Sequence, residues 1–243
     1  WSIKMAAAAH LMKDFRKMQT EPVEGCFVEL VSPDNVFAWR VFIEGPSETP
    51  YEGGVFQATL EFPNDYPMMP PTLTFLSEFW HPNVYKDGKV CISILHPPGD
   101  DPMSGELASE RWRPTQNVQS VLLSVISMIA DPNCSSPANV DASVEYRDRR
   151  EKFAERVKAL ADKAKKACPK RVVIPHPDTD PEERAKALKK FKLMAQLDSS
   201  DPWLDEPSYD DDDDMGFEDD DGDEAPLSDE DGSGAEEPLS DEE

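Results

Sequence analysis

Cys91 is the residue of this sequence whose type and setting best suit covalent chemistry. It lies in the apolar segment 89–95, inside a long stretch with many prolines and little periodicity. A cysteine thiolate is a strong nucleophile and a good leaving group, so it can accept an acyl group and then release it. A buried structural thiol is the simpler interpretation, although functional residues concentrate on loops. His96 follows five residues later, but no local Cys–His motif is visible, and a paired base is not predicted.

Asn83 is the second candidate, because it follows His81 and Pro82 shortly before Cys91. Pro-Asn is ordinary turn chemistry, and a simple turn is one interpretation. The functional interpretation is that the Asn83 amide donates an N–H group to a developing oxyanion. The acidic loop 99–106 lacks the alternating oxygen ligands of a calcium loop, so no metal site is predicted.

Four short runs of β-branched and aromatic residues must form the framework that positions these candidates. They predict strands over 27–31, 36–44, 55–62 and 73–76. The connections between them are too short for parallel crossovers, which indicates an antiparallel meander.

Helices are predicted on both sides of the strands in sequence. Apolar residues at helical spacing predict helices over 5–19, 118–130 and roughly 141–167. The fold class is therefore α+β. The long stretch 80–114 between the last strand and the second helix is expected to be an ordered loop that carries the site.

The negative charge of the chain is concentrated in segment 201–243. The formal net charge is −25, and this segment holds 22 of the 50 acidic residues and no Lys or Arg. Nucleic acids and anionic membranes attract clustered positive charge, so neither is predicted as a partner. The segment has too little apolar surface to fold and predicts a disordered tail. A helix with an Asp-Pro start is predicted just before it, over 181–197.

The four cysteines are too widely spaced for a disulfide framework or a paired zinc site, so reduced thiols are expected. No apolar run is long enough to span a bilayer, and no signal pattern is visible at the N-terminus. A cytoplasmic and nuclear protein is therefore expected. The cysteines are Cys26, Cys91, Cys134 and Cys168.

Six short motifs occur in order between residues 53 and 133. They are Gly53-Gly54-Val55-Phe56, Phe62-Pro63-x-x-Tyr66-Pro67-x-x-Pro70-Pro71, His81-Pro82-Asn83, Gly88-x-Val90-Cys91-Ile92, Trp112-x-Pro114 and Asp131-Pro132-Asn133. This ordered set resembles the ubiquitin-conjugating enzymes, over about residues 5–167.

The resemblance implies a thioester enzyme centred on Cys91. Cys91 would accept the C-terminal carboxyl of ubiquitin from the ubiquitin-activating enzyme and pass it to a lysine amine. No cofactor is implied, because ATP is used upstream by the activating enzyme. Asn83 matches the asparagine that organises the loop and stabilises the oxyanion in this family. Ser136 falls at the gate near the incoming amine, where a hydroxyl can position the amine but cannot be an ionised base.

The resemblance also implies a contact with RING ligases through the first helix and two loops. Pro67 and Met68 lie in one loop, and Pro114 and Thr115 lie in the other. Met68 occupies a position where some relatives have an aromatic residue.

The stretch 92–111 is longer than in compact members of the family. It resembles the subgroup that builds lysine-48-linked degradative chains, in which Asp100, Asp101 and Glu106 would attract and orient the acceptor lysine. A plain solvated loop is the alternative.

The C-terminal part resembles the cell-cycle conjugating enzymes that serve cullin-RING ligases, whose acidic tail docks on a basic cullin surface. This predicts a catalytic domain over 5–168, a linker and capped helix over 169–200, and a tail over 201–243. The alternative for the tail is a solubilising role. The alternatives for the whole protein are an endoplasmic-reticulum quality-control enzyme, whose relatives end soon after the catalytic domain, and a non-catalytic acidic ubiquitin-binding scaffold.

Overall fold

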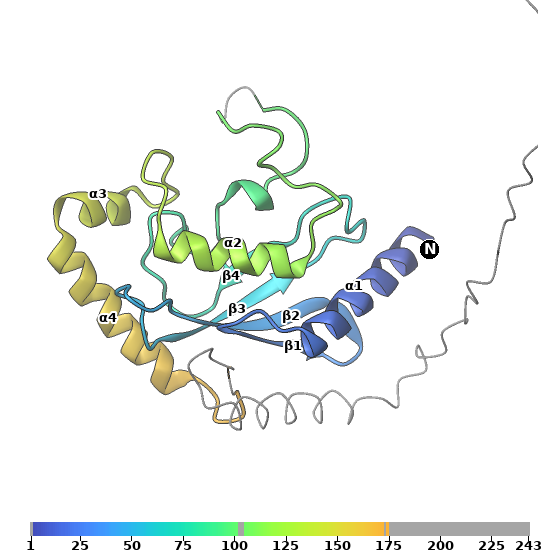
Figure 1. The fold of residues 1–243 in the computed structure, drawn as a ribbon, viewed down its shortest axis with the longest axis horizontal. Helices are drawn as coiled ribbons and strands as arrows, with labels where there is room; N and C mark the ends of the chain where they lie inside the picture. Colours follow the sequence, from blue (N-terminus) through green and yellow to red (C-terminus); the bar gives the residue numbers. More distant parts are fainter. Residues whose placement is uncertain (1, 102–104, 173, 175–243) are drawn as a thin grey trace, which may run out of the picture. The chain divides into compact units, whose positions relative to one another are not determined.

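The computed structural model describes residues 2–101, 105–172 and 174, all in the first of two units of the chain, Trp1–Pro202. The predicted helix over 181–197 and the predicted tail lie outside the described residues. The elements are α1 (Ser2–Thr20), β1 (Cys26–Ser32), β2 (Asn35–Glu44), β3 (Val55–Glu61), β4 (Thr72–Phe75), the 3₁₀ turn η1 (Ser93–Leu95), α2 (Val118–Ala130), α3 (Val140–Asp148) and α4 (Arg150–Ala167) (Figure 1). The predicted α+β class is confirmed.

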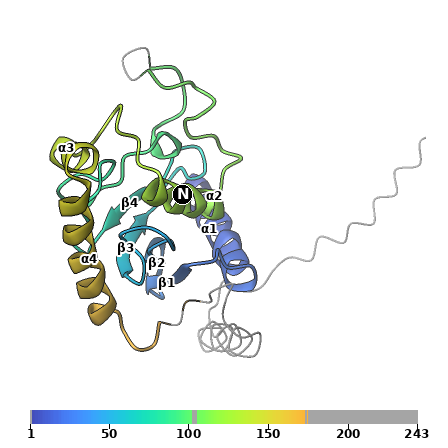
Figure 2. The ribbon, with the colours of Figure 1, turned by 60° about the vertical axis from the view of Figure 1, so that its left-hand side comes forward.

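The four strands form one antiparallel sheet in the order β1-β2-β3-β4. Trp39 in β2 pairs with Leu30 of β1 and with Leu60 of β3, which fixes the register across the first three strands. Helices α1 and α4 flank the sheet, and α2 crosses one of its faces (Figures 1 and 2). The meander predicted from the short connections is therefore confirmed.

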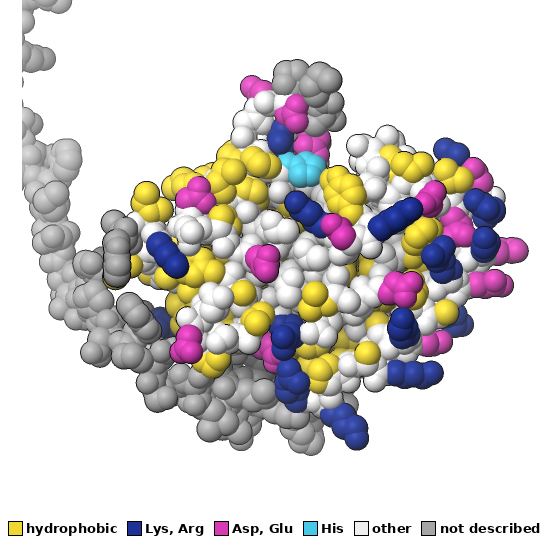
Figure 3. Space-filling model, turned by 180° about the vertical axis from the view of Figure 1, so that it is seen from behind, with side chains coloured by type: hydrophobic (Ala, Val, Ile, Leu, Met, Phe, Trp, Pro, Cys, Tyr) yellow, Lys and Arg dark blue, Asp and Glu magenta, His cyan; other side chains and the backbone are white. Residues whose placement is uncertain are grey.

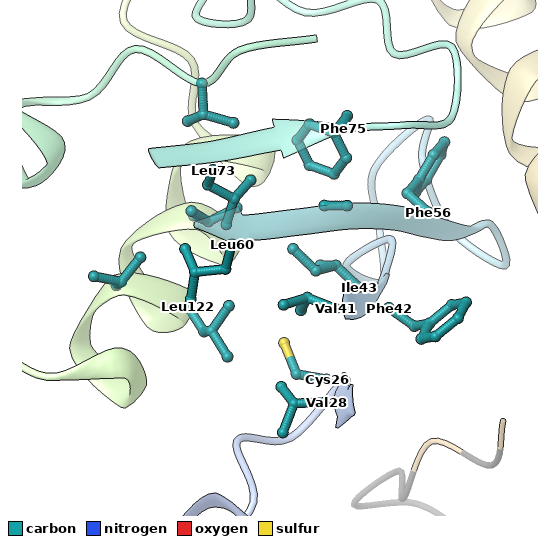
Figure 4. Close-up of a cluster of buried hydrophobic side chains, with 14 of the residues drawn as sticks. Cys26, Val28, Val41, Phe42, Ile43, Phe56, Leu60, Leu73, Phe75 and Leu122 are labelled. Carbon is teal, nitrogen blue, oxygen red and sulfur yellow. The ribbon is translucent and has the colours of Figure 1, made fainter. Parts of the chain in front are cut away.

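The core lies between the sheet and α2. Leu60 and Leu73 from the strands and Leu122 from α2 are fully buried and lie close together there (Figure 4). Burying a leucine side chain contributes roughly 1.5–3 kcal/mol, so such contacts hold α2 on the sheet. Cys26 is also in this cluster, and burial raises the pKa of its thiol to about 12.

Helix α2 begins and ends where local sequence signals predict. The Asn117 side chain accepts a hydrogen bond from the Ser120 N–H at 3.0 Å, and Ser120 Oγ accepts from the Asn117 N–H, which completes a capping box. The helix ends at Ala130, before Asp131 and Pro132. Because both ends are fixed, α2 sets the position of the loop that follows it, which forms one wall of the site.

The region 141–167 is not one helical run, because it breaks between α3 and α4. Arg149 leaves the helical conformation, with φ −140 and ψ 55. The break lets the buried Glu145 accept a hydrogen bond from Trp80 Nε1 at 2.8 Å and lie 3.4 Å from Lys152 Nζ. A buried carboxylate needs such partners, and tertiary contacts of this kind override local helical periodicity.

The chain just beyond α4 contacts β1. Arg171 Nη2 donates to Glu29 Oε1 at 2.7 Å, and Arg40 Nη1 lies 3.5 Å from the same oxygen. Val172 and Ile174 are partly buried against the core. The start of the predicted linker is thus attached to the outer strand of the sheet.

Candidate active site

Backbone hydrogen bonds bring Cys91 and Asn83 together. The segment after β4 turns back on itself, because Val84 pairs with Val90 in an isolated bridge. The Cys91 N–H then donates to Asn83 O at 2.9 Å. The turn requires Gly88, whose φ is +92 and where an added Cβ would lie 2.2 Å from Phe75 O. The two candidates that the sequence placed eight residues apart are therefore direct neighbours.

The Asn83 side chain holds the loop that follows α2. Its Nδ2 donates to Asn133 O at 2.9 Å, and its Oδ1 accepts from the Asn133 N–H at 2.8 Å. Asn83 is buried, and both the oxygen and the NH₂ group of its side-chain amide form hydrogen bonds with the backbone of Asn133. An NH₂ group has two N–H donors, and this contact uses one of them.

His81 supports Asn83 from beneath. Its Nδ1 accepts from the Asn83 N–H at 2.9 Å, so Nε2 carries the proton of the neutral ring and donates to Met128 O at 3.0 Å. His81 is fully buried, and this desolvation lowers its pKa to about 3, although the Met128 contact opposes the shift. The ring is therefore a neutral structural support with a fixed tautomer.

We expect the neutrality of His81 to make stability fall with acidification. Between the ordinary pKa of about 6.5 and the folded-state value, the unfolded chain binds a proton that the folded chain does not. This contribution is present above pH 6.5 and lost as pH falls, by about 2 kcal/mol between pH 6.5 and pH 5. Urea unfolding at pH 7 and pH 5 measures it. An unchanged free energy of unfolding would contradict a buried neutral His81.

Ser136 lies on the loop that Asn83 holds. It is exposed, three residues after Asn133, on the connection between α2 and α3. Asn133 Oδ1 accepts from the Ser135 N–H at 2.9 Å, which shapes the loop just before it. The structure therefore places Ser136 at the surface of a wall of the site, and its role at the incoming amine stays a prediction.

A histidine does face Cys91, contrary to the expectation from sequence. Cys91 Sγ lies 3.5 Å from His96 Nε2, because the turn η1 reverses the chain between them. His96 Nδ1 lies 2.9 and 2.8 Å from the two carboxylate oxygens of Glu106. Tyr85 Oη also donates toward Cys91 Sγ, at 3.7 Å. The five-residue spacing matches no helical or strand periodicity, so only the fold reveals this contact.

Glu106 and Arg111 hold the acidic loop against the chain segments on either side of it. Ser93 Oγ donates to Glu106 at 2.8 Å, while Arg111 Nε lies 3.8 Å from Glu106 and Arg111 Nη1 lies 3.4 Å from Asp101. Burial would raise the pKa of Glu106, but hydrogen bonds from His96 and Ser93 and nearby positive charge hold it below its usual range.

Asp100 differs from the other two acidic candidates, because it is exposed on the loop. Figure 3 shows the loop projecting from the body of the fold, with acidic side chains on it. Asp101 and Glu106 instead contact Arg111, although the Asp101 side chain is still 43% exposed.

The two loops expected to bind a RING ligase lie against each other. Trp112 is fully buried, and its Nε1 donates to Pro67 O at 2.7 Å. Met68 next to it is exposed, as are Pro114 and Thr115. The buried indole therefore brings the two predicted contact loops together.

All four cysteines are free. Burial raises the pKa of the Cys168 thiol, against a smaller opposing effect of Arg171. Among residues 2–101, 105–172 and 174, no cluster of His, Cys, Asp and Glu side chains is suited to hold a metal ion. Within those same ranges, every helix is too short or too polar to cross a membrane.

Comparison with known proteins gives consistent matches over this domain. Residues 10–161 match the family described as "Ubiquitin-conjugating enzyme". "Ubiquitin-conjugating enzyme E2 14" of Arabidopsis thaliana is 56% identical over 151 residues, which cover 62% of this chain and 90% of that protein. "Ubiquitin-conjugating enzyme E2 15" of Schizosaccharomyces pombe is 51% identical over 150 residues, 62% of this chain and 90% of that protein. "Ubiquitin-conjugating enzyme E2 G2" of Homo sapiens is 49% identical over 158 residues, 65% of this chain and 96% of that protein.

Proposed function

Because this chain belongs to the ubiquitin-conjugating enzyme family, we propose that it builds lysine-48-linked, degradative ubiquitin chains with cullin-RING ligases. It is a ubiquitin-transferring, thioester-forming enzyme, and the family uses no cofactor. Its partners are ubiquitin, the ubiquitin-activating enzyme and RING ligases. The observation that carries the finer proposal is the acidic insertion held beside Cys91 by Glu106 and Arg111. Activity in the cytoplasm and nucleus is part of the proposal.

In this proposal, Cys91 Sγ is the reacting atom of the enzyme in both transfer steps. In loading, Sγ attacks the thioester carbonyl of ubiquitin on the activating enzyme, and the activating enzyme's thiolate leaves. In discharge, an acceptor amine attacks the new carbonyl, a C–N bond forms, and Cys91 Sγ leaves. The half-exposed position of Cys91 on a loop suits a residue that must meet two large partners in turn.

Asn83 is proposed to stabilise the negative oxygen that forms during discharge. The contact with Asn133 leaves one Nδ2–H of Asn83 for this purpose. The bond from the Cys91 N–H to Asn83 O keeps the amide close to the reacting sulfur. A donor that is already oriented needs no reorganisation when charge develops.

Asp100 is proposed to attract the acceptor lysine. It is exposed on the loop, whereas Asp101 and Glu106 both contact Arg111. Ser136 on the opposite wall would then position the amine near the thioester.

Asp100→Asn tests this assignment. An exposed charge contributes at most about 1 kcal/mol, so we expect an increase of up to about fivefold in the KM for acceptor ubiquitin, with unchanged loading of Cys91. Linkage-resolved mass spectrometry of the chains should show lysine-48 linkages in wild type and a smaller share in the variant. Asp34→Asn, an exposed change in the turn between β1 and β2, is the matched control. Equal acceptor KM values for wild type and Asp100→Asn would contradict a role of Asp100 in acceptor binding and would favour a plain solvated loop.

Deletion of 201–243 tests the cullin-RING part of the proposal. Opposite charge speeds encounter by about 10- to 1000-fold and is screened by salt. We therefore expect unchanged thioester formation, slower cullin-RING-dependent chain assembly, and a difference that shrinks as salt rises. A scrambled tail of the same composition, which keeps the charge, is the control and should restore the rate.

Equal rates with and without the tail would leave only a solubilising role for it. That result would favour the quality-control branch, whose members end soon after the catalytic domain. The matched relatives are consistent with such short proteins, because the matched part makes up 90% or more of each of them.

A further inference from the structure

Helix α3 carries a buried carboxylate that the transfer steps described above do not use. Glu145 is only 4% exposed and accepts a hydrogen bond from Trp80 Nε1 at 2.8 Å. Trp80 directly precedes the His81-Pro82-Asn83 segment. We propose that Glu145, by bonding α3 to Trp80, positions the Ser136 loop, residues 131–139, for the attacking amine. The proposal rests on the proposed place of this loop beside the incoming amine.

Glu145 is the centre of a charge network that joins three parts of the fold. Lys152 Nζ lies 3.4 Å and Arg156 Nη1 lies 3.7 Å from its carboxylate oxygens. The Arg156 guanidinium also stacks on Trp80, 3.5 Å from the ring centroid. Desolvation of a buried charge offsets much of what its partners contribute, so an apolar side chain of similar volume often packs as stably. The network therefore contributes mainly a fixed arrangement of α3, α4 and the segment at Trp80.

Segment 80–83 is held from other sides as well. Tyr51 Oη donates to Trp80 O at 2.6 Å, and His81 Nε2 donates to Met128 O of α2 at 3.0 Å. Neither contact involves α3. Loss of the network would therefore release α3 and leave segment 80–83 in place.

The Ser136 loop is attached to the same segment near both of its ends. The Asn133 backbone pairs with the Asn83 side chain, and the Asn139 N–H donates to Pro82 O at 2.8 Å. Asn139 is also the residue at which the loop enters α3. Ser136 lies midway between the two attachments in sequence. Its position near the thioester thus depends on where α3 is held.

Helix α3 has few other contacts that could fix it. It is nine residues long, and a break at Arg149 separates it from α4 (Figure 1). Its buried residues are Ala142, Ser143 and Glu145, of which Glu145 alone has a long side chain. A displacement of about 1 Å near a reacting group can slow a reaction about 100-fold. The Glu145 contact is therefore the one most able to control the loop.

Glu145→Met tests this role, because methionine keeps similar volume and helix propensity but accepts no strong hydrogen bond. We expect unchanged loading of Cys91 and discharge to free lysine slower by about 10- to 100-fold. Cleavage of the same thioester by hydroxylamine should be unchanged, because this small, strong nucleophile needs no positioning by the loop. The ratio of lysine to hydroxylamine rates is the readout, since a general loss of stability does not select between nucleophiles. Urea unfolding follows stability separately.

Further variants isolate the hydrogen bond itself. Glu145→Gln keeps an oxygen acceptor for Trp80 Nε1 and should retain a ratio close to that of the wild type. Trp80→Phe removes the donor but keeps a ring under Arg156, and should lower the ratio as Glu145→Met does. Because both changes break one bond, their combination should be no slower than the slower single variant. Glu78→Met is the matched control, since its exposed carboxylate pairs with Lys163 of α4 at 3.2 Å, and it should keep the wild-type ratio.

A wild-type ratio for Glu145→Met, or a ratio for Glu145→Gln as low as that of Glu145→Met, would overturn the proposal. Independent, additive effects of Glu145→Met and Trp80→Phe would also overturn it. Ser136→Ala tests the proposed function separately, because it removes the hydroxyl and leaves the loop where it is. A wild-type ratio for Ser136→Ala would remove only the hydroxyl from amine positioning, and the Glu145 variants would still decide the role of the network.

Discussion

Replacing Cys91 by alanine is expected to abolish the ubiquitin adduct that wild type forms with activating enzyme and ATP. Removing the nucleophile of a covalent mechanism lowers the rate by at least about a thousandfold. Of the other three thiols, Cys134 is half-exposed on the loop after α2 and needs a variant of its own. Cys26 is buried, with a pKa raised to about 12, and Cys168 lies beyond α4 against the core. Non-reducing electrophoresis with and without a thiol reductant measures the adduct.

Two further variants make the result specific to the sulfur of Cys91. Cys91→Ser is expected to form its adduct slowly and as an ester, which resists the thiol reductant because an alkoxide is a poor leaving group. Cys134→Ala removes the half-exposed thiol of the loop after α2 and should load ubiquitin at the wild-type rate. A reductant-sensitive adduct on Cys91→Ala would contradict the assignment, and it would revive the possibility of a non-catalytic ubiquitin-binding scaffold.

Replacing Asn83 by alanine is expected to have the second largest effect, on both stability and transfer. The Asn133 N–H and C=O would lose their partners, and because Asn133 is exposed to water, each lost hydrogen bond destabilises by about 0.5–1.5 kcal/mol. Loss of a donor to the oxyanion lowers a transfer rate by about 100- to 1000-fold. Single-turnover discharge from preloaded enzyme to free lysine, together with urea unfolding, measures the two effects separately.

Two comparisons separate the oxyanion role of Asn83 from its structural role. Asn83→Asp can still accept from the Asn133 N–H but has lost both N–H donors, so its discharge rate should fall as in the alanine variant. Asn139→Ala removes the N-cap of α3, because the Asn139 side chain accepts from the Ala142 N–H at 3.2 Å. It should destabilise by about 1 kcal/mol with little change in discharge. If Asn83→Asp discharges at the wild-type rate, the amide only organises the loop.

Strands and helices were predictable because their signals are local. The runs of β-branched and aromatic residues matched β1 to β4 within one residue at each end, and the apolar face over 118–130 matched α2. In that helix the apolar Ile126 is only half-buried, whereas Met128 is buried. The break between α3 and α4 was missed, because it satisfies the distant pair of Trp80 and Glu145, which no helical periodicity encodes.

The sequence also identified Cys91 and Asn83, because each lies in a short motif of defined order. It did not identify their backbone contact, which depends on the bridge between Val84 and Val90. It likewise treated Glu106 as one more acidic side chain of a loop. Its contact with His96 depends on how the whole insertion folds back, over a spacing that has no regular period.

The sequence alone therefore determined the α+β class, the candidate nucleophile Cys91 and the two regions of unusual acidity, because residue type and short-range spacing encode them. The tertiary structure alone decided that His96 lies beside Cys91, that Glu106 contacts His96, and that Asp100 is exposed. These facts depend on hydrogen bonds between residues that a folded loop brings together. A hydrogen bond requires a donor and an acceptor within about 3 Å of each other, and only the three-dimensional path of the chain sets that distance.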